Sequence, residues 1–184
     1  GMARMDAEDM FEAIVLFKES LALNPRYLEP MLQLAEAYYY LDEYDEALRY
    51  VSMAIPLGKD NSSLLNIHGR ILLALGKTDE AAAIFRSIQK REPYNVDALL
   101  GLAEFSLAKG DELSALKNYQ KSLEYQSKNR RILLSLALMY ESRNDRTQSE
   151  TFLLKALDTY PENPLVQTLA GEYYLRRGQL KDAE

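Results

Sequence analysis

Residues 35–50 read AEAYYYLDEYDEALRY, and the small residue Ala47 near the end of this stretch belongs to a repeated pattern. Counting 34 positions at a time from Ala47, in either direction, meets a small residue at every step. These residues are Ala13, Ala47, Ala81, Ala115, Ser149 and Ala183. A second small set keeps the same interval, namely Ala35, Gly69, Ala103, Ala137 and Gly171. Because no insertion interrupts the count, the sequence predicts an array of repeated structural units.

Each repeat has the pattern of two amphipathic helices. Apolar residues at spacings of three and four positions indicate these helices, which in the second repeat are expected at about 29–41 and 44–57. Between the two helices the backbone must leave helical geometry, and the residues at this place are Asp42, Gly76, Gly110 and Asn144. Each pair of helices leaves an apolar face that only the next pair covers, so the units are expected to stack.

The repeat resembles the tetratricopeptide repeat, which follows the pattern W-x2-L-G-x2-Y, then A-x3-F, then P. In the third repeat these places are held by Leu65, His68, Gly69, Leu72, Ala81, Phe85 and Pro93. The chain departs from the pattern because it has no tryptophan, and because Lys59 and Ser127 replace the expected proline. The resemblance covers essentially the whole chain. It implies an all-α fold, a right-handed superhelical solenoid of helix-turn-helix repeats.

The expected organisation is a single array over 1–184. It has a partial repeat at 1–27, repeats at 28–61, 62–95, 96–129 and 130–163, and a partial repeat at 164–184. Leu169, Tyr173 and Leu180 look as though they require a further helix, so the C-terminal end is predicted to be an open apolar face. We therefore expect the chain to be a segment of a longer protein, able to associate with a second copy through this end.

Composition narrows the function classes. The formal net charge is −6 and no basic stripe is present, which argues against a nucleic-acid partner. The chain lacks cysteine, so disulfides and cysteine-ligated metals are excluded. The apolar stretch 132–140 is half of what a membrane span requires, so direct membrane insertion is not expected. A soluble acidic protein is predicted; its compartment is not assigned, although the cytoplasm is slightly favoured.

Catalytic and metal-binding patterns are weak. His68, the sole histidine, replaces a leucine of the helical packing face, and we interpret it as a buried or half-buried packing residue. Gly76-Lys77-Thr78 imitates the end of a phosphate-binding loop, but Ile71 stands where that loop needs glycine and no strand precedes it. We therefore expect no catalytic residues, no metal site and no cofactor, and predict that the chain is not an enzyme.

The tyrosines divide into packing and binding candidates. Tyr38 occupies the aromatic place of the repeat. Tyr44 is expected to pack at the turn into the second helix, and Tyr50 within that helix, one residue before the packing position Val51. Tyr39, and with less reason Tyr40, has no packing place to fill. The resemblance implies that first helices line a concave inner groove, into which Tyr39 is predicted to project.

The residues predicted to line this groove are Glu29, Gln33, Glu36, Tyr39, Asn66, Arg70, Leu73, Asp97, Leu100, Glu104, Leu107, Arg131, Leu134 and Leu138. Leucines alternate with charges and carboxylates outnumber arginines, which favours a peptide with apolar anchors and some basic residues. Some family members use a Lys/Asn clamp to bind a C-terminal carboxylate. That mode is not expected, because the matching places hold Glu29, Gln33, Ile67 and Gly101.

The leading functional interpretation is a non-catalytic protein–protein interaction scaffold. It would bind a peptide or protein segment in the concave groove and thereby help to assemble a complex. A second interpretation is a substrate-recruiting segment of a larger enzyme, for example a glycosyltransferase, whose catalytic domain lies outside this chain. A simpler alternative for the groove residues is that they only keep this face soluble.

Overall fold

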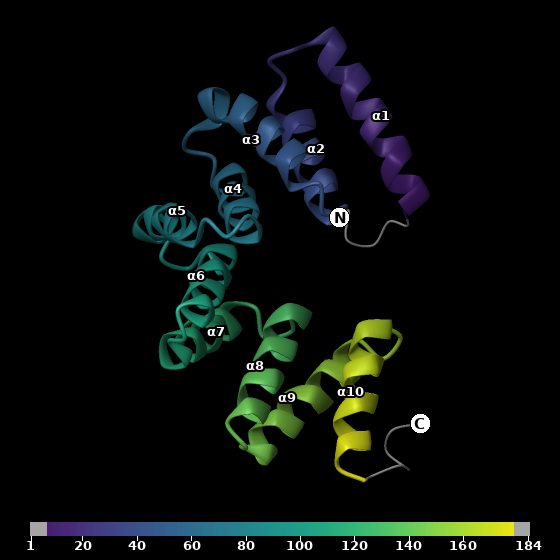
Figure 1. Cartoon of the computed structure of the whole chain (residues 1–184), viewed down its shortest axis with the longest axis vertical. Helices are drawn as coiled ribbons and strands as arrows, with labels where there is room; N and C mark the ends of the chain where they lie inside the picture. The colour runs from purple at the N-terminus through teal and green to yellow at the C-terminus, as the bar shows by residue number, and fades with distance from the viewer. Residues whose placement is uncertain (1–6, 179–184) are drawn as a thin grey trace. The chain divides into compact units, whose positions relative to one another are not determined.

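The computed structural model describes residues 7–178, and these form α-helices joined by short turns (Figure 1). No strand occurs in this part of the chain, so the all-α fold class predicted from the repeat is confirmed. The helices are α1 (Ala7–Leu23), α2 (Leu28–Tyr40), α3 (Tyr44–Gly58), α4 (Ser62–Ala74), α5 (Thr78–Arg91), α6 (Val96–Ala108), α7 (Glu112–Tyr125), α8 (Arg130–Ser142), α9 (Arg146–Thr159) and α10 (Pro164–Arg176).

The helix boundaries follow the 34-residue interval. The first helices of successive repeats begin at residues 28, 62, 96, 130 and 164, and the second helices at 44, 78, 112 and 146. The helices expected at 29–41 and 44–57 are α2 and α3, which agree with the prediction to within one residue at each end. The helix-turn-helix repeat predicted from the spacing of small residues is therefore confirmed.

The turns inside the repeats have a left-handed residue at the predicted place. Asp42 and Asn144 have φ angles of 60° and 58°, and Gly76 and Gly110 both have 74°. This conformation ends the first helix and is easy for glycine, while aspartate and asparagine tolerate it better than other residues. The four residues that the sequence analysis placed at these turns are confirmed there.

Asparagine caps begin the first helices α4, α6, α8 and α10, whereas α2 follows Tyr27, which makes no capping hydrogen bond. The Asn61 side chain accepts a hydrogen bond from the Leu64 backbone N–H, and the same contact recurs one, two and three repeats later. The corresponding caps are Asn95, Asn129 and Asn163. A capping side chain satisfies a helical N–H that has no partner within the helix, and it stabilises the helix by about 1 kcal/mol.

The helices form two compact units, Gly1–Ala108 and Lys109–Glu184. Unit 1 contains α1 to α6, and unit 2 contains α7 to α10. In unit 1, Ala35 of α2 and Ala47 of α3 are fully buried. Side chains of this size let the two helical backbones approach closely, as predicted from the repeat.

Phe85 of α5 is fully buried in unit 1 beside two glycines. A Cβ atom placed on Gly69 of α4 would lie 2.5 Å from Cζ of the Phe85 ring, and one placed on Gly101 of α6 would lie closer still. The ring therefore occupies the space that side chains at these two positions would need. Glycine is required here by close packing rather than by backbone conformation.

Both units contain a stacked pair of aromatic rings that joins the two helices of one repeat. In unit 1, Tyr38 stacks on Tyr50 with ring centroids 5.7 Å apart and an interplanar angle of 8°. In unit 2, Tyr140 stacks on Phe152 at 5.7 Å and 9°. Tyr38 and Tyr50 therefore have the packing roles that the repeat predicts. Such ring pairs stabilise by about 0.5–1.5 kcal/mol beyond their buried area.

One residue of the open apolar face predicted at the C-terminal end, Tyr173, is buried. Tyr173 of α10 is buried within unit 2, and its hydroxyl donates to the backbone carbonyl of Arg146 at 3.3 Å. The Arg177 guanidinium carbon lies 3.9 Å from the Tyr173 ring centroid. Leu169 is half-buried, and Leu180 lies outside the described residues. Tyr173 is thus already covered and offers no apolar surface to a second copy.

Candidate functional site

An arginine stacked on two tyrosines is the main feature of the first helices of unit 1. The guanidinium carbon of Arg70 in α4 lies 4.3 Å from the ring centroid of Tyr39 and 5.6 Å from that of Tyr40, both in α2. The two rings meet edge to face at 5.8 Å, and Tyr44 lies 5.7 Å from Tyr39. Each cation–π contact contributes about 0.5–2 kcal/mol. We call Arg70, Tyr39 and Tyr40 the arginine–tyrosine cluster.

The cluster retains hydrogen-bonding capacity. Nε of Arg70 is buried and has no hydrogen-bond partner in the structure. Tyr39 and Arg70 are half-buried, and Tyr40 is exposed. An unpaired buried N–H costs free energy that a bound acceptor would recover. Tyr40, which the sequence left as a second candidate binding ring, is thus part of the same feature as Tyr39.

A half-buried carboxylate, Glu36, accompanies the cluster in α2. Burial raises the pKa of Glu36, the nearby charge of Arg70 opposes this rise, and the charges of Glu29 and Asp97 add to it. Glu29 is exposed and accepts a hydrogen bond from Gln33 at 2.8 Å, and Asp97 at the start of α6 is also exposed. The predicted excess of negative charge is therefore present among the first helices of unit 1.

One position of the repeat, held by Asn66, Leu100 and Leu134, was predicted to line the groove but is buried. Leu100 is 1% exposed and Leu134 is 6% exposed, so neither lies on a surface open to a partner. Asn66, at the equivalent place in α4, is also buried, and its Nδ2 donates to Asn95 at 3.1 Å while Oδ1 has no partner. In unit 1 the first helices α4 and α6 contact each other, and the Asn66 side chain of α4 bonds to the Asn95 cap of α6.

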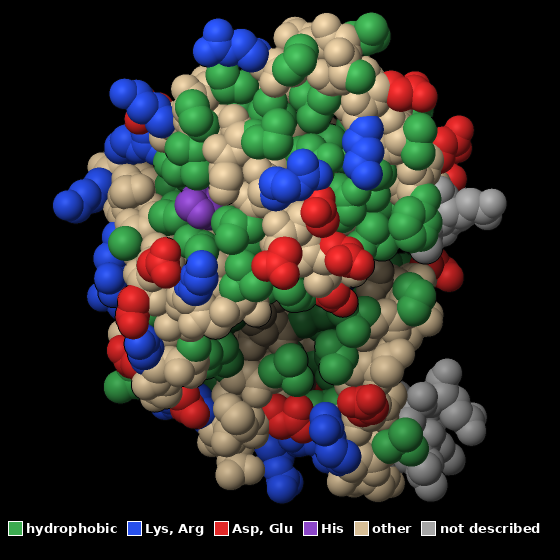
Figure 2. Space-filling view, turned by 45° about the horizontal axis from the view of Figure 1, so that its top comes forward, with side chains coloured by type: hydrophobic (Ala, Val, Ile, Leu, Met, Phe, Trp, Pro, Cys, Tyr) green, Lys and Arg blue, Asp and Glu red, His purple; other side chains and the backbone are tan. Residues whose placement is uncertain are grey.

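The remaining predicted positions are partly or fully accessible. Leu73 and Glu104 are half-buried and Leu107 is exposed in unit 1, whereas Arg131 is half-buried and Leu138 exposed in unit 2. On the face shown in Figure 2, apolar side chains reach the surface at many places between charged ones. Each unit therefore has exposed apolar side chains next to charged ones. In unit 1, the arginine–tyrosine cluster differs from the other accessible positions because its three side chains are packed against one another.

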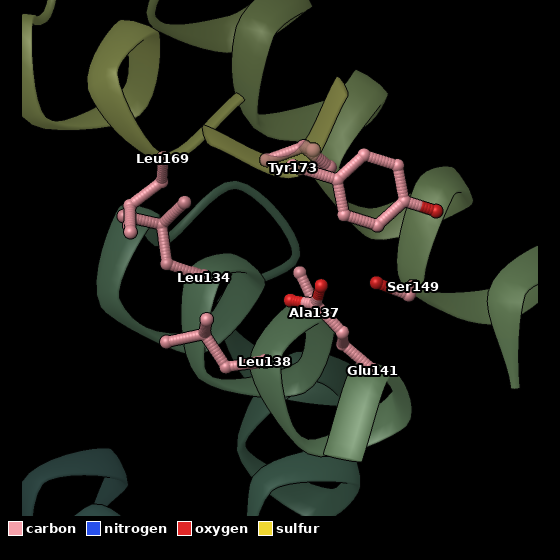
Figure 3. Close-up of a pocket in the computed structure, with 8 residues that line it drawn as sticks. Leu134, Ala137, Leu138, Glu141, Ser149, Leu169 and Tyr173 are labelled. Atoms are coloured by element: carbon pink, nitrogen blue, oxygen red, sulfur yellow. The ribbon is translucent and has the colours of Figure 1, made fainter. Parts of the chain in front are cut away.

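Unit 2 contains a small pocket between α8, α9 and α10 (Figure 3). Its volume is about 10 Å³, enough for one water-sized group. The pocket is lined by Leu134, Ala137, Leu138, Glu141, Ser149, Leu153, Leu169 and Tyr173. Ser149 is 1% exposed, and its hydroxyl has no hydrogen-bond partner. This pocket was not predicted from the sequence, although Ser149 among the repeated alanines was the available signal.

His68 has the packing environment that the sequence predicts. It is half-buried, and burial lowers its pKa while the charge of Glu80 opposes this effect. Among residues 7–178, no group of three His, Cys, Asp or Glu side chains is arranged to hold a metal ion. Within the same residues, no helix is both long and apolar enough to cross a membrane.

Comparison with known proteins identifies the repeat. The family profile described as tetratricopeptide repeat matches residues 4–71 and 72–112, which is more than half of the chain. The BBSome complex member BBS4 of Bos taurus is 26% identical over 133 residues, covering 72% of this chain and 25% of that protein. A TPR repeat-containing protein of Treponema pallidum is 25% identical over 172 residues, covering 94% and 20%. The chain spans a quarter or less of these relatives.

Solved structures show the same fold. PilW, a type IV pilus biogenesis factor, gives a TM-score of 0.77 at 20% identity, covering 99% of this chain and 84% of PilW. A thermophilic TPR protein of Thermus thermophilus gives 0.76 at 23% identity, covering 85% and 86%. The Cut9–Hcn1 assembly of the APC/C gives 0.81 at 19% identity, covering 92% and 34%. At these identities the likeness concerns the fold alone.

Proposed function

This chain belongs to the tetratricopeptide repeat family, and we propose that it is a non-catalytic scaffold that binds a peptide or protein segment through the first helices of unit 1. The observation that carries the proposal is the arginine–tyrosine cluster. Its guanidinium lies on two rings, its Nε–H is buried without a partner, and Tyr40 is exposed beside it. Aromatic and arginine side chains in such partly desolvated positions dominate the energetics of many interfaces.

The charge around the cluster favours a ligand with basic residues. Glu29 and Asp97 are exposed, and Glu36 is half-buried with a pKa that its acidic neighbours help to raise. A cationic group near Glu36 would relieve this repulsion. The buried Nε–H of Arg70 calls for an acceptor, which a peptide backbone carbonyl supplies. We therefore expect a segment that combines basic side chains with at least one apolar residue near Tyr40.

A role in complex assembly is supported by the relatives. One of them is a member of the BBSome complex. Each of the two units has apolar and charged side chains at its surface, which suits a chain that contacts a partner protein. In our proposal, the segment bound by unit 1 belongs to a protein that this scaffold brings into a larger assembly.

The test is selection of peptides from a random phage-displayed library on the immobilised chain, followed by measurement of peptide affinity by calorimetry. We expect enrichment of peptides with basic and apolar residues. Arg70→Ala and Tyr39→Ala should each weaken binding by about tenfold or more. The matched control is Arg49→Ala, because the Arg49 guanidinium carbon also lies over a tyrosine, 4.4 Å from the Tyr50 ring centroid, but on a second helix. Equal affinity of the wild type and the two cluster variants would overturn the proposal.

A further inference from the structure

The pocket of unit 2 coincides with two departures from the repeat pattern. Where this repeat has Ser149, the repeats before it have Ala13, Ala47, Ala81 and Ala115. Where it has Glu141, the other repeats have Tyr39, Leu73, Leu107 and Leu175. The hydroxyl of Ser149 in α9 and the carboxylate of Glu141 in α8 both line this pocket and point into it in Figure 3. In this repeat, two polar side chains therefore replace less polar ones, and both line the same small pocket.

The Ser149 hydroxyl has an unmet hydrogen-bonding requirement. It is almost completely buried, and the structure gives its oxygen no partner. The third polar residue in the lining, Tyr173, directs its hydroxyl to the Arg146 carbonyl instead. A buried polar group without a partner is uncommon in folded proteins, and it indicates a bound water or a ligand atom. The equivalent alanines would avoid this cost altogether.

We propose that this pocket binds the side chain of a lysine, with its ammonium between Glu141 and Ser149. The inference rests on the proposed function, because the lysine belongs to a protein segment bound by the scaffold. An ammonium is a compact group with three donors, and both Glu141 and Ser149 offer acceptors. The aliphatic stem would run along Leu138 and Leu169, which lie on the opposite side of the pocket in Figure 3.

Other groups fit these walls less well. A volume of about 10 Å³ holds one water-sized group, so only the lysine ammonium enters and its stem lies over the exposed Leu138, whereas the planar guanidinium of arginine is too large to enter. A carboxylate would be repelled by Glu141, and a methyl group would leave the Ser149 hydroxyl unsatisfied. A neutral hydroxyl would satisfy Ser149 but would not use the charge of Glu141. Only an ammonium on an aliphatic stem uses the two acceptors and the leucine wall together.

Two arginines near the pocket set the local charge. Arg176 of α10 contacts one oxygen of Glu141 at 3.4 Å, and the guanidinium of Arg177 lies over the Tyr173 ring. The contact with Arg176 is long and the Arg176 side chain is mostly exposed, so the contact stabilises little. A carboxylate has about four lone-pair sites, so Glu141 is able to accept from Arg176 and from a ligand ammonium. Because the positive charge of Arg176 repels a ligand ammonium, removing Arg176 should strengthen lysine binding.

The experiment is a titration of the full chain, labelled with ¹³C in its leucine methyl groups, with Nα-acetyl-lysine N-methylamide. The methyl resonances of Leu138 and Leu169 report on the pocket by NMR. Two control ligands are the corresponding norleucine amide, which has no ammonium, and the arginine amide. We expect the lysine amide to shift these resonances in a saturable manner, and both controls to bind at least about tenfold more weakly.

Variants distinguish binding in the pocket from non-specific electrostatic attraction of the ligand to the acidic chain. Glu141→Gln should weaken lysine binding by about tenfold or more, and Ser149→Ala by about threefold. Glu162→Gln, an exposed carboxylate in the turn before α10, should leave it unchanged. Equal affinities for lysine and norleucine amides, or an unchanged affinity of Glu141→Gln, would overturn the proposal. A titration without saturable shifts would also overturn it and leave a bound water as the occupant.

The outcome is independent of the test of the proposed function. The lysine amide is a small molecule, and its binding to unit 2 does not involve the arginine–tyrosine cluster of unit 1. Saturable lysine binding combined with an unaltered peptide affinity of Arg70→Ala would refute the proposed peptide site alone. Loss of peptide affinity in Arg70→Ala combined with no lysine binding would refute the lysine pocket alone.

Discussion

The second helices of the third and fifth repeats bury different side chains at the same repeat place, Phe85 in unit 1 and Leu153 in unit 2. The ring of Phe85 lies between Gly69 and Gly101, where an added Cβ would meet it. Counting two intervals of 34 residues from these glycines leads to Ala137 and Leu169. A large central side chain with two glycines is thus exchanged for a smaller one with alanine and leucine. The total side-chain volume at this place therefore depends on three positions, one in the second helix and two in the adjoining first helices.

The two sets of side chains do not fill the space at this repeat place equally well. Ala137, Leu153 and Leu169 all line the small pocket of unit 2, beside the unpaired hydroxyl of Ser149. In unit 1 the corresponding space is taken by the Phe85 ring. Close packing gives unit 1 a tighter core at this place, whereas looser packing gives unit 2 a site that a small polar group is able to enter. Three predictions test this contrast and a fourth concerns the charged side chains of unit 1, in order from the largest expected effect to the smallest.

The first prediction compares the two central side chains. Phe85→Ala should lower the free energy of unfolding by about 4 kcal/mol, because a buried ring is lost from a tightly packed place. Leu153→Ala should lower it by about 2–3 kcal/mol, since fewer atoms are removed. Urea unfolding followed by circular dichroism, fitted with a nearest-neighbour model suited to repeat arrays, measures both values. A larger cost for Leu153→Ala would contradict the contrast between the two units.

The second prediction concerns the glycines of unit 1. Gly101→Ala should destabilise by about 1–3 kcal/mol because the added methyl group overlaps the buried Phe85 ring. Combining it with Phe85→Leu should recover much of this loss, giving a coupling free energy of about 1 kcal/mol in a double-mutant cycle.

Gly58→Ala is the matched control for this cycle. Its added Cβ would meet a terminal methyl carbon of the half-buried Leu28 at 2.9 Å, and this methyl group is able to move. We therefore expect a smaller effect than for Gly101→Ala. Additive effects of Gly101→Ala and Phe85→Leu would show that the ring does not impose glycine at position 101.

The third prediction concerns the unpaired hydroxyl of unit 2. Without ligand, Ser149→Ala should stabilise the chain by about 1 kcal/mol, because it removes a buried hydroxyl that has no partner. The matched control is Ser122→Ala, since the buried Ser122 hydroxyl donates to the Asn118 carbonyl at 2.8 Å. That control should give no gain in urea unfolding. A loss of stability in Ser149→Ala would mean that its hydroxyl is well satisfied in solution.

The fourth prediction is a pH dependence in the first helices of unit 1. The pKa of Glu36 is raised in the folded state by burial and by the charges of Glu29 and Asp97. The contribution of Glu36 to stability is therefore most favourable below its unfolded pKa and is lost as pH rises through its folded pKa. Glu36→Gln should stabilise the chain at pH 7 by less than about 1 kcal/mol and lose this advantage at low pH. Thermal unfolding of the wild type and of Glu36→Gln, measured at pH 7 and at low pH, checks the sign of this difference in stability. A variant that is less stable than the wild type at pH 7 would contradict the prediction.

Much of the fold was predictable because it follows from local patterns that recur. The 34-residue interval places the helix starts, and the turn residues Asp42 and Asn144 adopt the left-handed conformation at the predicted places. The stacked pair Tyr38 and Tyr50 was also assigned to packing, which the structure bears out. These features depend on helical periodicity and on single-residue backbone preferences, which a sequence displays directly.

The candidate sites were predictable only in part. Tyr39 and Arg70 were both assigned to a binding face, but their stacking on each other depends on how α2 and α4 approach in space. Leu100 and Leu134 were assigned to the same face and are buried instead. Periodicity gives the direction of a side chain from its own helix, yet it does not tell how closely the neighbouring first helix covers it.

The sequence by itself determined the repeat, the helix boundaries, the turns and the absence of cysteine chemistry, because each of these resides in residue identity and spacing. Tertiary structure alone decided that Phe85 imposes glycine on two neighbouring helices, and that Glu141 and Ser149 line one pocket from α8 and α9. These outcomes depend on distances of a few ångströms between helices. Packing sets such distances through the combined volumes of many side chains, and no single stretch of sequence records them.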